Sequence, residues 1–279
     1  MPSPLSPSET RTLLEKLGHR PVKKLGQNFL IDGNIVRKSL ELAEIESGDR
    51  IVEVGPGLGT LTRALIDAGA SVYAVEKDPR LSSHLAELET AYPNKFHLLQ
   101  GDALEHPLAN LHSEGERFKI VANLPYAIST PWMESVIDEP LPYSLTLMLQ
   151  KETAERFIAE PGSKQFGSIS IFIQNAFEFE GTWDVAPSCF YPKPDVDSRL
   201  IHLKLKESPY LFPKADRELI RELFQQRRKQ IGSLLRKSSR QRSQKWLAKL
   251  AEINGEPQMR PEQIGLEAWK ILSESTSCS

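Results

Sequence analysis

The 279-residue sequence predicts an α/β fold: a parallel, doubly wound sheet is extended by an antiparallel hairpin and followed by a small helical domain. Three observations support this prediction. Short apolar runs alternate with helical patterns in the first half of the chain, which is typical of parallel sheets. A glycine-rich turn, Gly55–Gly59, separates one of these runs from a helical pattern. Beyond about residue 208, only helical patterns continue.

The individual elements follow from the periodicity of the apolar residues. Helices are expected near residues 34–45, from Pro79 and from Lys151, whereas residues 165–175 suit either a strand or a helix. The expected strands are Ile51–Val54, Ser71–Val75, Lys95–Gln100, Phe118–Ala122 and Ser144–Leu149, with Phe177–Trp183 and Arg199–Leu205 as the hairpin. We therefore predict a flexible tail at residues 1–20, a sheet domain at 21–207 and a helical domain at 208–279.

Composition narrows the class of protein. The net charge is -2, with 39% hydrophobic and 26% charged residues, which is typical of a chain with a packed core. No apolar run approaches the roughly 20 residues of a membrane span, and Met1–Pro7 lacks the apolar region of a signal peptide. Cys189 and Cys278 have neither a metal-ligand nor a disulfide spacing. We expect a cytoplasmic, monomeric protein without a membrane partner or a metal.

Positive charge is concentrated near the C-terminus, in residues 214–249. Such a local excess is the electrostatic mark of phosphate binding, although a solvated helical face is the alternative. The residues predicted to contact phosphates are Arg227, Arg228, Lys229, Arg236 and Lys237.

The glycine-rich turn is the first candidate ligand site. Glycine adopts positive φ at little cost and lets a ligand lie against the backbone, as at Gly55 and Gly57. A strand, a glycine turn and a helix together begin a nucleotide-binding unit. A dinucleotide oxidoreductase, an S-adenosylmethionine methyltransferase and a purely structural turn would all show this pattern. The third glycine, Gly59, comes one place earlier than in the dinucleotide fingerprint, which favours the methyltransferase.

Two carboxylates stand at the ends of later strands. Glu76 follows the turn by about twenty residues, where a carboxylate can accept both hydroxyls of a ribose. Asp102 can accept a hydrogen bond from an exocyclic amine, such as that of a cofactor adenine. The carboxyl ends of parallel strands meet at one edge of the sheet, where such folds bind ligands. The segment Lys23–Leu30 is either a lid over this edge or an ordinary loop.

The sequence Asn123-Leu124-Pro125-Tyr126 follows the fourth predicted strand and carries the strongest chemical signal. The lone pair of an exocyclic adenine nitrogen is delocalised into the ring. The Asn123 side-chain oxygen and the Leu124 carbonyl can each accept one N–H, which frees that lone pair to attack a methyl sulfonium. Pro125 stiffens the turn, and Tyr126 offers a face on which a base can stack. Phe190 is either a clamp on the other face of the base or a core aromatic.

Together these segments resemble the small-subunit rRNA adenine dimethyltransferases, a family with relatives that methylate large-subunit rRNA and confer macrolide resistance. The resemblance extends from about Pro21 to Leu250. The matching segments are Leu25–Leu30, Val52–Thr62, Val75–Asp78, Gly101–Ala103, Asn123–Tyr126, Gln150–Glu152, Phe190–Ser198 and Arg227–Lys229. Two departures, Ala127 and Gly232-Ser233, fall at the rim of the target pocket and at one helical RNA contact.

The resemblance implies a Rossmann-like, class I S-adenosylmethionine methyltransferase with a C-terminal RNA-binding domain. Its implied substrate is a pair of adjacent adenosines in the 3′-terminal hairpin loop of small-subunit rRNA, dimethylated at N6 during subunit maturation. The expected cofactor contacts are Asn28, Leu30, Gly55, Gly57, Glu76, Asp102 and Asn123. An inactive assembly factor with the same fold is the main alternative, and the intact Asn123 and Tyr126 argue against it.

Overall fold

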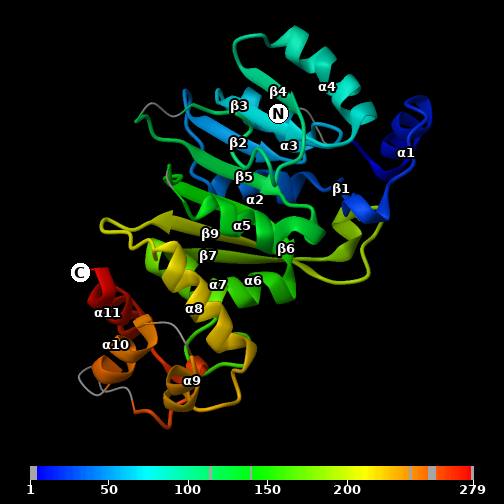
Figure 1. Cartoon of the computed structure of the whole chain (residues 1–279). Helices are drawn as coiled ribbons and strands as arrows, with labels where there is room; N and C mark the ends of the chain where they lie inside the picture. Colours follow the sequence, from blue (N-terminus) through cyan, green and yellow to red (C-terminus); the bar gives the residue numbers. More distant parts are fainter. Residues whose placement is uncertain (1–4, 113–114, 139, 239–240, 251–255, 278–279) are drawn as a thin grey trace. The chain divides into compact units, whose positions relative to one another are not determined.

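The computed structural model describes all residues except 1–4, 113–114, 139, 239–240, 251–255 and 278–279, and it divides into two compact units (Figure 1). The first unit comprises residues 1–154 and 179–205, and the second comprises 155–178 and 206–279. The predicted sheet domain included residues 155–178, so the structure differs from the prediction there. The reason is helix α7 (Ser168–Ala176), whose largely apolar surface packs against helices α8 and α11 of the second unit.

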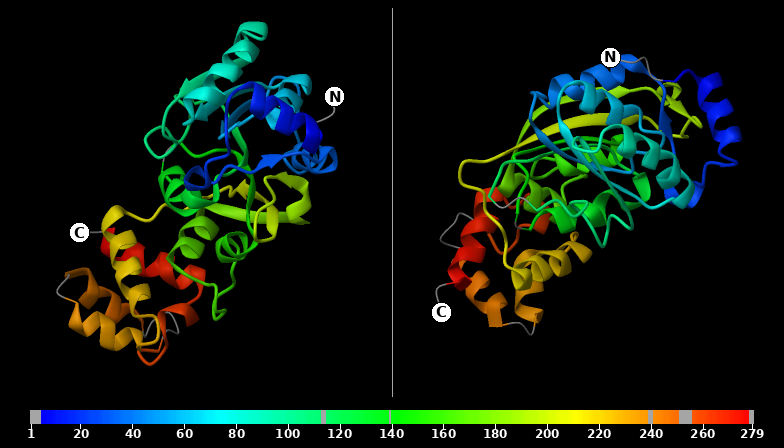
Figure 2. Two further views of the ribbon diagram at one scale, coloured as in Figure 1. Left: turned by 90° about the vertical axis from the view of Figure 1, so that its right-hand side faces the viewer. Right: turned by 90° about the horizontal axis from the view of Figure 1, so that it is seen from above.

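A seven-stranded sheet has the order β4-β3-β2-β5-β6-β9-β7. Strands β2 to β6 pair in parallel, and β9 runs antiparallel to β6, which confirms the predicted fold class. The strands are β2 Arg50–Val54, β3 Ser71–Glu76, β4 Phe96–Gln100, β5 Lys119–Asn123, β6 Ser144–Gln150, β7 Phe177–Val185 and β9 Ser198–Leu205. The apolar runs of β2 and β6 are buried because helices cover both faces of the sheet (Figure 2).

A second, two-stranded sheet joins distant segments of the chain. Strand β1 (Phe29–Leu30) pairs antiparallel with β8 (Phe190–Tyr191). The remaining elements of this part of the chain are α1 Pro7–Lys16, η1 Lys23–Leu25, α2 Gly33–Leu42, α3 Thr60–Asp67, α4 Pro79–Ala91, η2 Tyr126–Ile128, α5 Ser129–Val136, α6 Lys151–Phe157 and η3 Pro187–Cys189. Pairing with β8 places the segment around β1 beside the edge of the large sheet that holds the candidate site.

Part of the predicted N-terminal tail, residues 1–20, is a helix in the structure. Helix α1 begins with a capping box, in which Glu9 N–H donates to Ser6 Oγ at 3.3 Å and Ser6 N–H donates to Glu9 Oε2 at 2.8 Å. Leu14 is 3% exposed and packs with Phe29, Leu58 and other apolar side chains. Residues 7–16 are therefore a helix packed against the segments that form the candidate site.

The second unit is helical, as predicted for the C-terminal region. It contains α7, α8 (Lys214–Gln225), α9 (Ile231–Lys237), α10 (Gln241–Leu250), η5 (Pro261–Gln263) and α11 (Leu266–Ser277). Trp246 and Trp269 are fully buried and contact each other edge to face at 6.0 Å. The Asp216 carboxylate is also buried, and it accepts hydrogen bonds from Arg242 Nη1 at 2.8 Å and Ser273 Oγ at 2.6 Å. One arginine of the basic region therefore holds helices of this unit together.

Packing explains why a glycine stands at position 232. Gly232 N–H donates to the Pro257 carbonyl at 2.9 Å, and Ile231 N–H donates to the Met259 carbonyl at 2.8 Å. A Cβ on Gly232 would lie 2.6 Å from Pro257 Cβ and 2.9 Å from its carbonyl oxygen. Gly232, one of the two departures from the family pattern, is therefore explained by the close contact between α9 and residues 256–259.

We predict that Gly232→Ala destabilises the protein by about 1–3 kcal/mol, because the added methyl forces apart two backbone segments. Thermal unfolding measures this loss. Gly265→Ala is the matched control, since nothing lies within 4 Å of a Cβ there. Equal melting temperatures for the two variants would contradict the packing argument.

Candidate active site

A cavity opens at the carboxyl ends of the parallel strands in the first unit. It is lined by residues 24–30, 53–58, 60–61, 75–77, 81, 101–103 and 123–128. This lining contains every residue predicted for the cofactor: Asn28, Leu30, Gly55, Gly57, Glu76, Asp102 and Asn123. Leu124, Tyr126 and Ala127 also line it, and so does most of the segment proposed as a lid.

Two motifs that are distant in sequence meet in this cavity. Asn123 Nδ2 donates to the Asn28 carbonyl at 3.0 Å, which leaves Asn123 Oδ1 as the acceptor end of the amide. Gly26 has a φ of +65°, and a Cβ there would lie 3.2 Å from the Tyr126 nitrogen. The Leu25–Leu30 and Asn123–Tyr126 segments are therefore in backbone contact. This contact decides how the Asn123 amide is oriented.

The glycine turn is shaped by its neighbours as well as by its dihedral angles. Gly55 and Gly57 have φ values of +66° and +60°. A Cβ on Gly55 would lie 3.2 Å from Pro125 Cγ, and one on Gly57 would lie 3.1 Å from the Phe29 ring. Gly57 therefore makes room for Phe29 as well as for a ligand. Larger residues at positions 55 and 57 would keep the turn from approaching Pro125 and Phe29 this closely.

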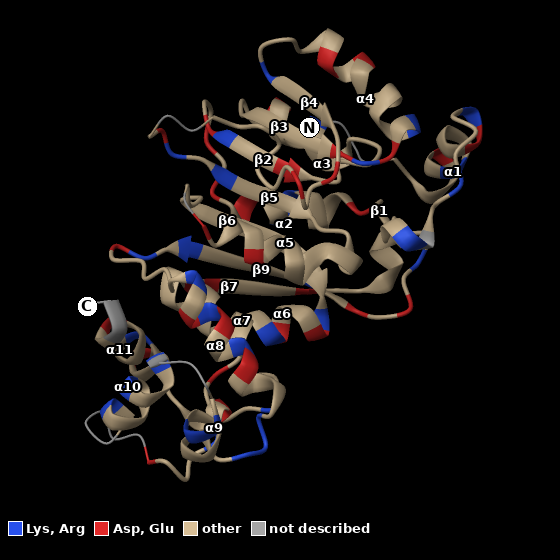
Figure 3. Cartoon of the chain, in the orientation of Figure 1, with Lys and Arg blue, Asp and Glu red and all other residues tan. Residues whose placement is uncertain are grey.

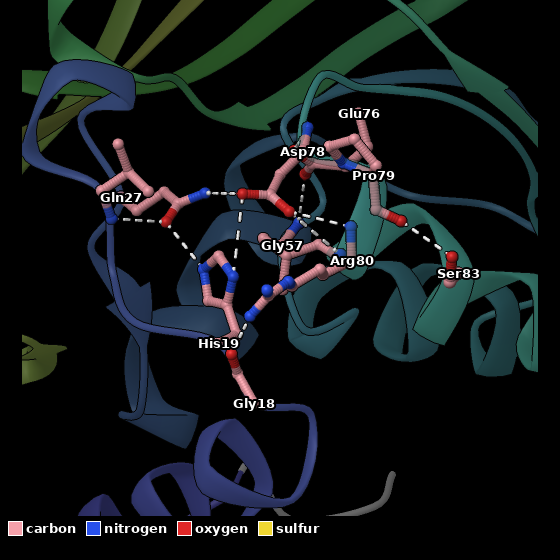
Figure 4. Close-up of polar contacts among 11 residues, drawn as sticks. Gly18, His19, Gln27, Gly57, Glu76, Asp78, Pro79, Arg80 and Ser83 are labelled. Carbon is pink, nitrogen blue, oxygen red and sulfur yellow. Dashed lines mark hydrogen bonds and ion pairs between the residues drawn. The ribbon is translucent and has the colours of Figure 1, made fainter.

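Glu76 is buried and held by backbone donors. Gly57 N–H donates to its Oε2 at 3.1 Å and Asp78 N–H donates to its Oε1 at 2.9 Å (Figure 4). Burial raises the pKa of the Glu76 carboxyl. Asp102 lies nearer to solvent, where Lys77 Nζ donates to it at 2.5 Å and lowers the pKa of its carboxyl. The pKa values of the Glu76 and Asp102 carboxyl groups are thus shifted in opposite directions.

Glu53 is a cavity residue to which the sequence analysis assigned no role. Its side chain is 2% exposed, and Thr62 Oγ1 donates to its Oε2 at 2.7 Å. Burial raises the pKa of this carboxyl to about 8, which the Thr62 bond only partly offsets. A glutamate within the apolar run Ile51–Val54 is the signal that could have identified it.

The two predicted aromatics have different environments. The Tyr126 hydroxyl lies 2.5 Å from Ser198 Oγ, and burial raises the pKa of the phenol. Phe190 is 2% exposed, packs in the core with Leu30 and Leu200, and is not a cavity residue. Pairing of β8 with β1 places Phe190 in the core, which was the alternative considered for it, and its role as a clamp on a bound base stays a prediction.

The comparisons with known proteins agree with this arrangement. The profile of the family described as "Ribosomal RNA adenine dimethylase" matches residues 18–270. This chain belongs to that family. It is 55% identical to "Ribosomal RNA small subunit methyltransferase A" of Opitutus terrae, over 96% of this chain and 98% of that protein. It is 37% identical to the protein of the same name from Chlamydia abortus, over 96% of each chain.

Solved structures support the same assignment. The 23S rRNA methyltransferase ErmE has a TM-score of 0.65 and 27% identity, and the match covers 90% of this chain and 100% of that one. A dimethyladenosine transferase from Plasmodium falciparum has the same fold, with a TM-score of 0.74 and 24% identity over 88% of this chain and 95% of that one. This member of the dimethylase family is therefore an S-adenosylmethionine-dependent rRNA adenine methyltransferase.

The cavity fits S-adenosylmethionine chemically. Glu53 and Glu76 are acids in its wall, and the cofactor is a sulfonium with an ammonium group. Glu76 and Asp102 can accept from ribose hydroxyls and the adenine amine respectively. The positive φ values of Gly55 and Gly57 leave backbone facing the cavity.

Within the described residues, no cluster of His, Cys, Asp and Glu could hold a metal ion. Among the described helices, none is long and apolar enough to cross a membrane.

The basic residues of the second unit divide into two groups. Arg228, Arg236, Lys237 and Lys229 are exposed on and just before α9, where Figure 3 shows blue segments. Arg227 is half-buried instead. It forms an ion pair with Glu262 and donates from Nη1 to the Lys164 carbonyl at 2.9 Å. Its guanidinium is therefore engaged within the unit. In the exposed group, Lys229 Nζ donates to Gln226 Oε1 at 2.7 Å.

We predict that the protein loses stability as pH rises from about 4.5 to about 8. The unfolded chain releases the Glu53 proton near the ordinary pKa of 4.5, whereas the folded protein retains it up to about 8. Folding therefore binds a proton in this window, and Glu53→Gln should flatten the fall. Burial also raises the pKa of Glu76, so a smaller slope of the same sign should persist.

Thermal unfolding of the wild type and of Glu53→Gln, at intervals across this pH range, measures the difference. Asp184→Asn is the control, because its pKa of about 2 means that it does not titrate within the window. Parallel curves for the wild type and Glu53→Gln would contradict the assignment of this proton to Glu53.

Proposed function

We propose that this enzyme transfers methyl groups to N6 of two adjacent adenosines in the 3′-terminal hairpin loop of small-subunit rRNA, giving N6,N6-dimethyladenosine during subunit maturation. We further propose that it acts as a monomer in the cytoplasm on the maturing small ribosomal subunit. The relatives named for small-subunit rRNA support this choice of substrate over large-subunit rRNA. The observation that carries the chemistry is the orientation of the Asn123 amide.

The Asn123 oxygen is the acceptor for the target amine. Because Nδ2 donates to the Asn28 carbonyl, Oδ1 is the end available to the adenine N6–H. The Leu124 carbonyl is the second acceptor, on a turn that Pro125 restricts. Two acceptors draw the amine toward a tetrahedral geometry and localise its lone pair. The methylated amine is acidic and loses one proton to solvent, so one N–H is left after the first methylation, and one acceptor is enough to hold it for the second.

We assign different residues to cofactor binding and to holding the target base. S-adenosylmethionine, when bound, supplies the methyl group as a sulfonium electrophile. Glu76 would hold the ribose hydroxyls, Asp102 would hold the adenine amine, and Asn28 and Leu30 would form the wall beside them. Tyr126 would stack on the target base. The burial that raises the pKa of the Tyr126 phenol disfavours a tyrosinate, so this residue is not assigned as a base.

RNA binding is assigned to the exposed basic group of the second unit: Arg228, Lys229, Arg236 and Lys237. These side chains can reach phosphates at little cost, since phosphate contacts come mainly from exposed cations. Arg227, which the sequence analysis included, is instead assigned mainly to the packing of its own unit, because Glu262 already neutralises it.

We predict that Asn123→Ala lowers the rate of single-turnover methyl transfer by about a hundredfold or more, since a hydrogen bond formed chiefly in the transition state is removed. Tyr126→Phe should retain most activity, whereas Tyr126→Ala should lose about 1–3 kcal/mol of stacking. Labelled methyl transfer to unmethylated small subunits, at saturating enzyme, measures both effects. If Tyr126→Phe were as damaging as Tyr126→Ala, and the rate rose steeply with pH, the tyrosine would be a general base.

We predict that changing Arg228, Lys229, Arg236 and Lys237 to Gln weakens binding to small subunits without altering cofactor affinity. The slope of log affinity against log salt should flatten by about one unit for each phosphate that the variant no longer neutralises. The control for the loss of four charges alone changes four exposed positions of the first unit to Gln: Lys16, Arg37, Arg63 and Arg117. Wild-type affinity and slope in the quadruple variant would show that the group is a solvated face.

A further inference from the structure

A buried polar contact beside the cofactor cavity joins three segments of the first unit. His19 Nε2 lies 2.9 Å from Gln27 Oε1, and Gln27 Nε2 donates to Asp78 Oδ2 at 3.2 Å (Figure 4). His19 Nδ1 is 3.7 Å from the same Asp78 oxygen. His19 and Asp78 are only 6% and 7% exposed. These three residues, here called the His19 clasp, follow α1, precede β1 and precede α4.

The hydrogen bonds define which ring nitrogen of His19 carries a proton. Val22 N–H donates to Gln27 Oε1 at 2.8 Å, so this oxygen is an acceptor and the amide cannot be reversed. Gln27 Nε2 faces a carboxylate, which requires the same orientation. His19 Nε2 must therefore be the donor in its contact with Gln27. The ring orders Gln27 through a directed hydrogen bond in addition to its packing.

Each end of the clasp leads to a group that faces the cavity. Gln27 precedes Asn28, whose carbonyl accepts from the Asn123 amide at 3.0 Å. Asp78 caps α4 through Arg80 N–H at 2.9 Å, and its own N–H donates to Glu76 at 2.9 Å. The clasp thus links the segment that orients the target-amine acceptor to the segment that orients the ribose acceptor.

His19 itself does not line the cavity. Its ring meets the Phe29 ring edge-on, with centroids 6.5 Å apart, and Phe29 is the wall against which Gly57 packs. Arg80 also donates to the carbonyl of Gly18, the residue before His19, so this end of the N-terminal segment is held to α4 at a second point.

We propose that His19 is a positioning residue for both cofactor binding and methyl transfer. By donating to Gln27 Oε1 beside Asp78, it orients the Gln27 amide that bonds to Asp78 and so fixes the distance between the Asn28 carbonyl and the Glu76 carboxylate. The part of the inference that concerns the target amine rests on the function proposed above; the part that concerns cofactor binding does not. A misplacement of about 1 Å at such a site can cost a hundredfold in rate.

The test compares His19→Leu with His19→Gln, in which the glutamine amide can supply a donor near the position of the imidazole Nε2. His202→Leu is the matched control, because His202 is also 6% exposed, bonds to Thr146 at 2.8 Å and is not a cavity residue. Three quantities are measured for each variant: the melting temperature, the affinity for S-adenosylhomocysteine by calorimetry, and the single-turnover rate on saturated small subunits.

We expect His19→Leu to lose about tenfold or more in both ligand affinity and saturated rate, at temperatures well below unfolding. His19→Gln should recover most of both losses, and His202→Leu should lower only the melting temperature. Unchanged affinity and rate in His19→Leu, or losses that His202→Leu reproduces for an equal drop in melting temperature, would overturn the proposal. A wild-type protein that binds the ligand but methylates no small subunit would instead reject the proposed function.

Discussion

One hydrogen bond, from Asn123 Nδ2 to the Asn28 carbonyl, sets the polarity of the whole site. A side-chain amide has a donor end and an acceptor end, and the target amine of an adenine needs an acceptor. Reversing the amide would oppose two oxygen acceptors at the Asn28 carbonyl and remove the stabilisation. The turn at Gly26, with its positive φ and its close approach to Tyr126, and the pairing of β1 with β8 both place the Asn28 carbonyl where it can impose this orientation.

The electrostatics of the cavity favour a cationic cofactor. Glu53 and Glu76 are 2% and 5% exposed, and removing two carboxyl groups from water is costly unless hydrogen bonds or a cation compensate. Thr62, Gly57 and Asp78 supply hydrogen bonds. A bound sulfonium and ammonium would favour the ionised form of these carboxyl groups, whereas the pyrophosphate of a dinucleotide would disfavour it. Burial alone keeps the proton on Glu53 up to about pH 8.

The basic region shows that a cluster of positive charge in a sequence need not be a single surface. Arg227 and Arg242 form ion pairs with Glu262 and Asp216 inside the second unit. The exposed residues on and before α9 keep their charge at the surface. Both groups come from the same basic stretch of the sequence, so only their neighbours distinguish a residue that stabilises the unit from one that can meet a phosphate.

The sequence by itself determined which apolar runs form strands and which polar residues stand at the carboxyl ends of those strands. Because parallel strands share one carboxyl edge, it follows that Glu76, Asp102 and Asn123 line one cavity. Only the tertiary structure decided where Phe190 packs, to which of the two units residues 155–178 belong, and that His19 contacts Asp78. Periodicity reports which face of an element is apolar, but it does not report which distant element covers that face. The final location of an aromatic or a buried polar side chain depends on that pairing.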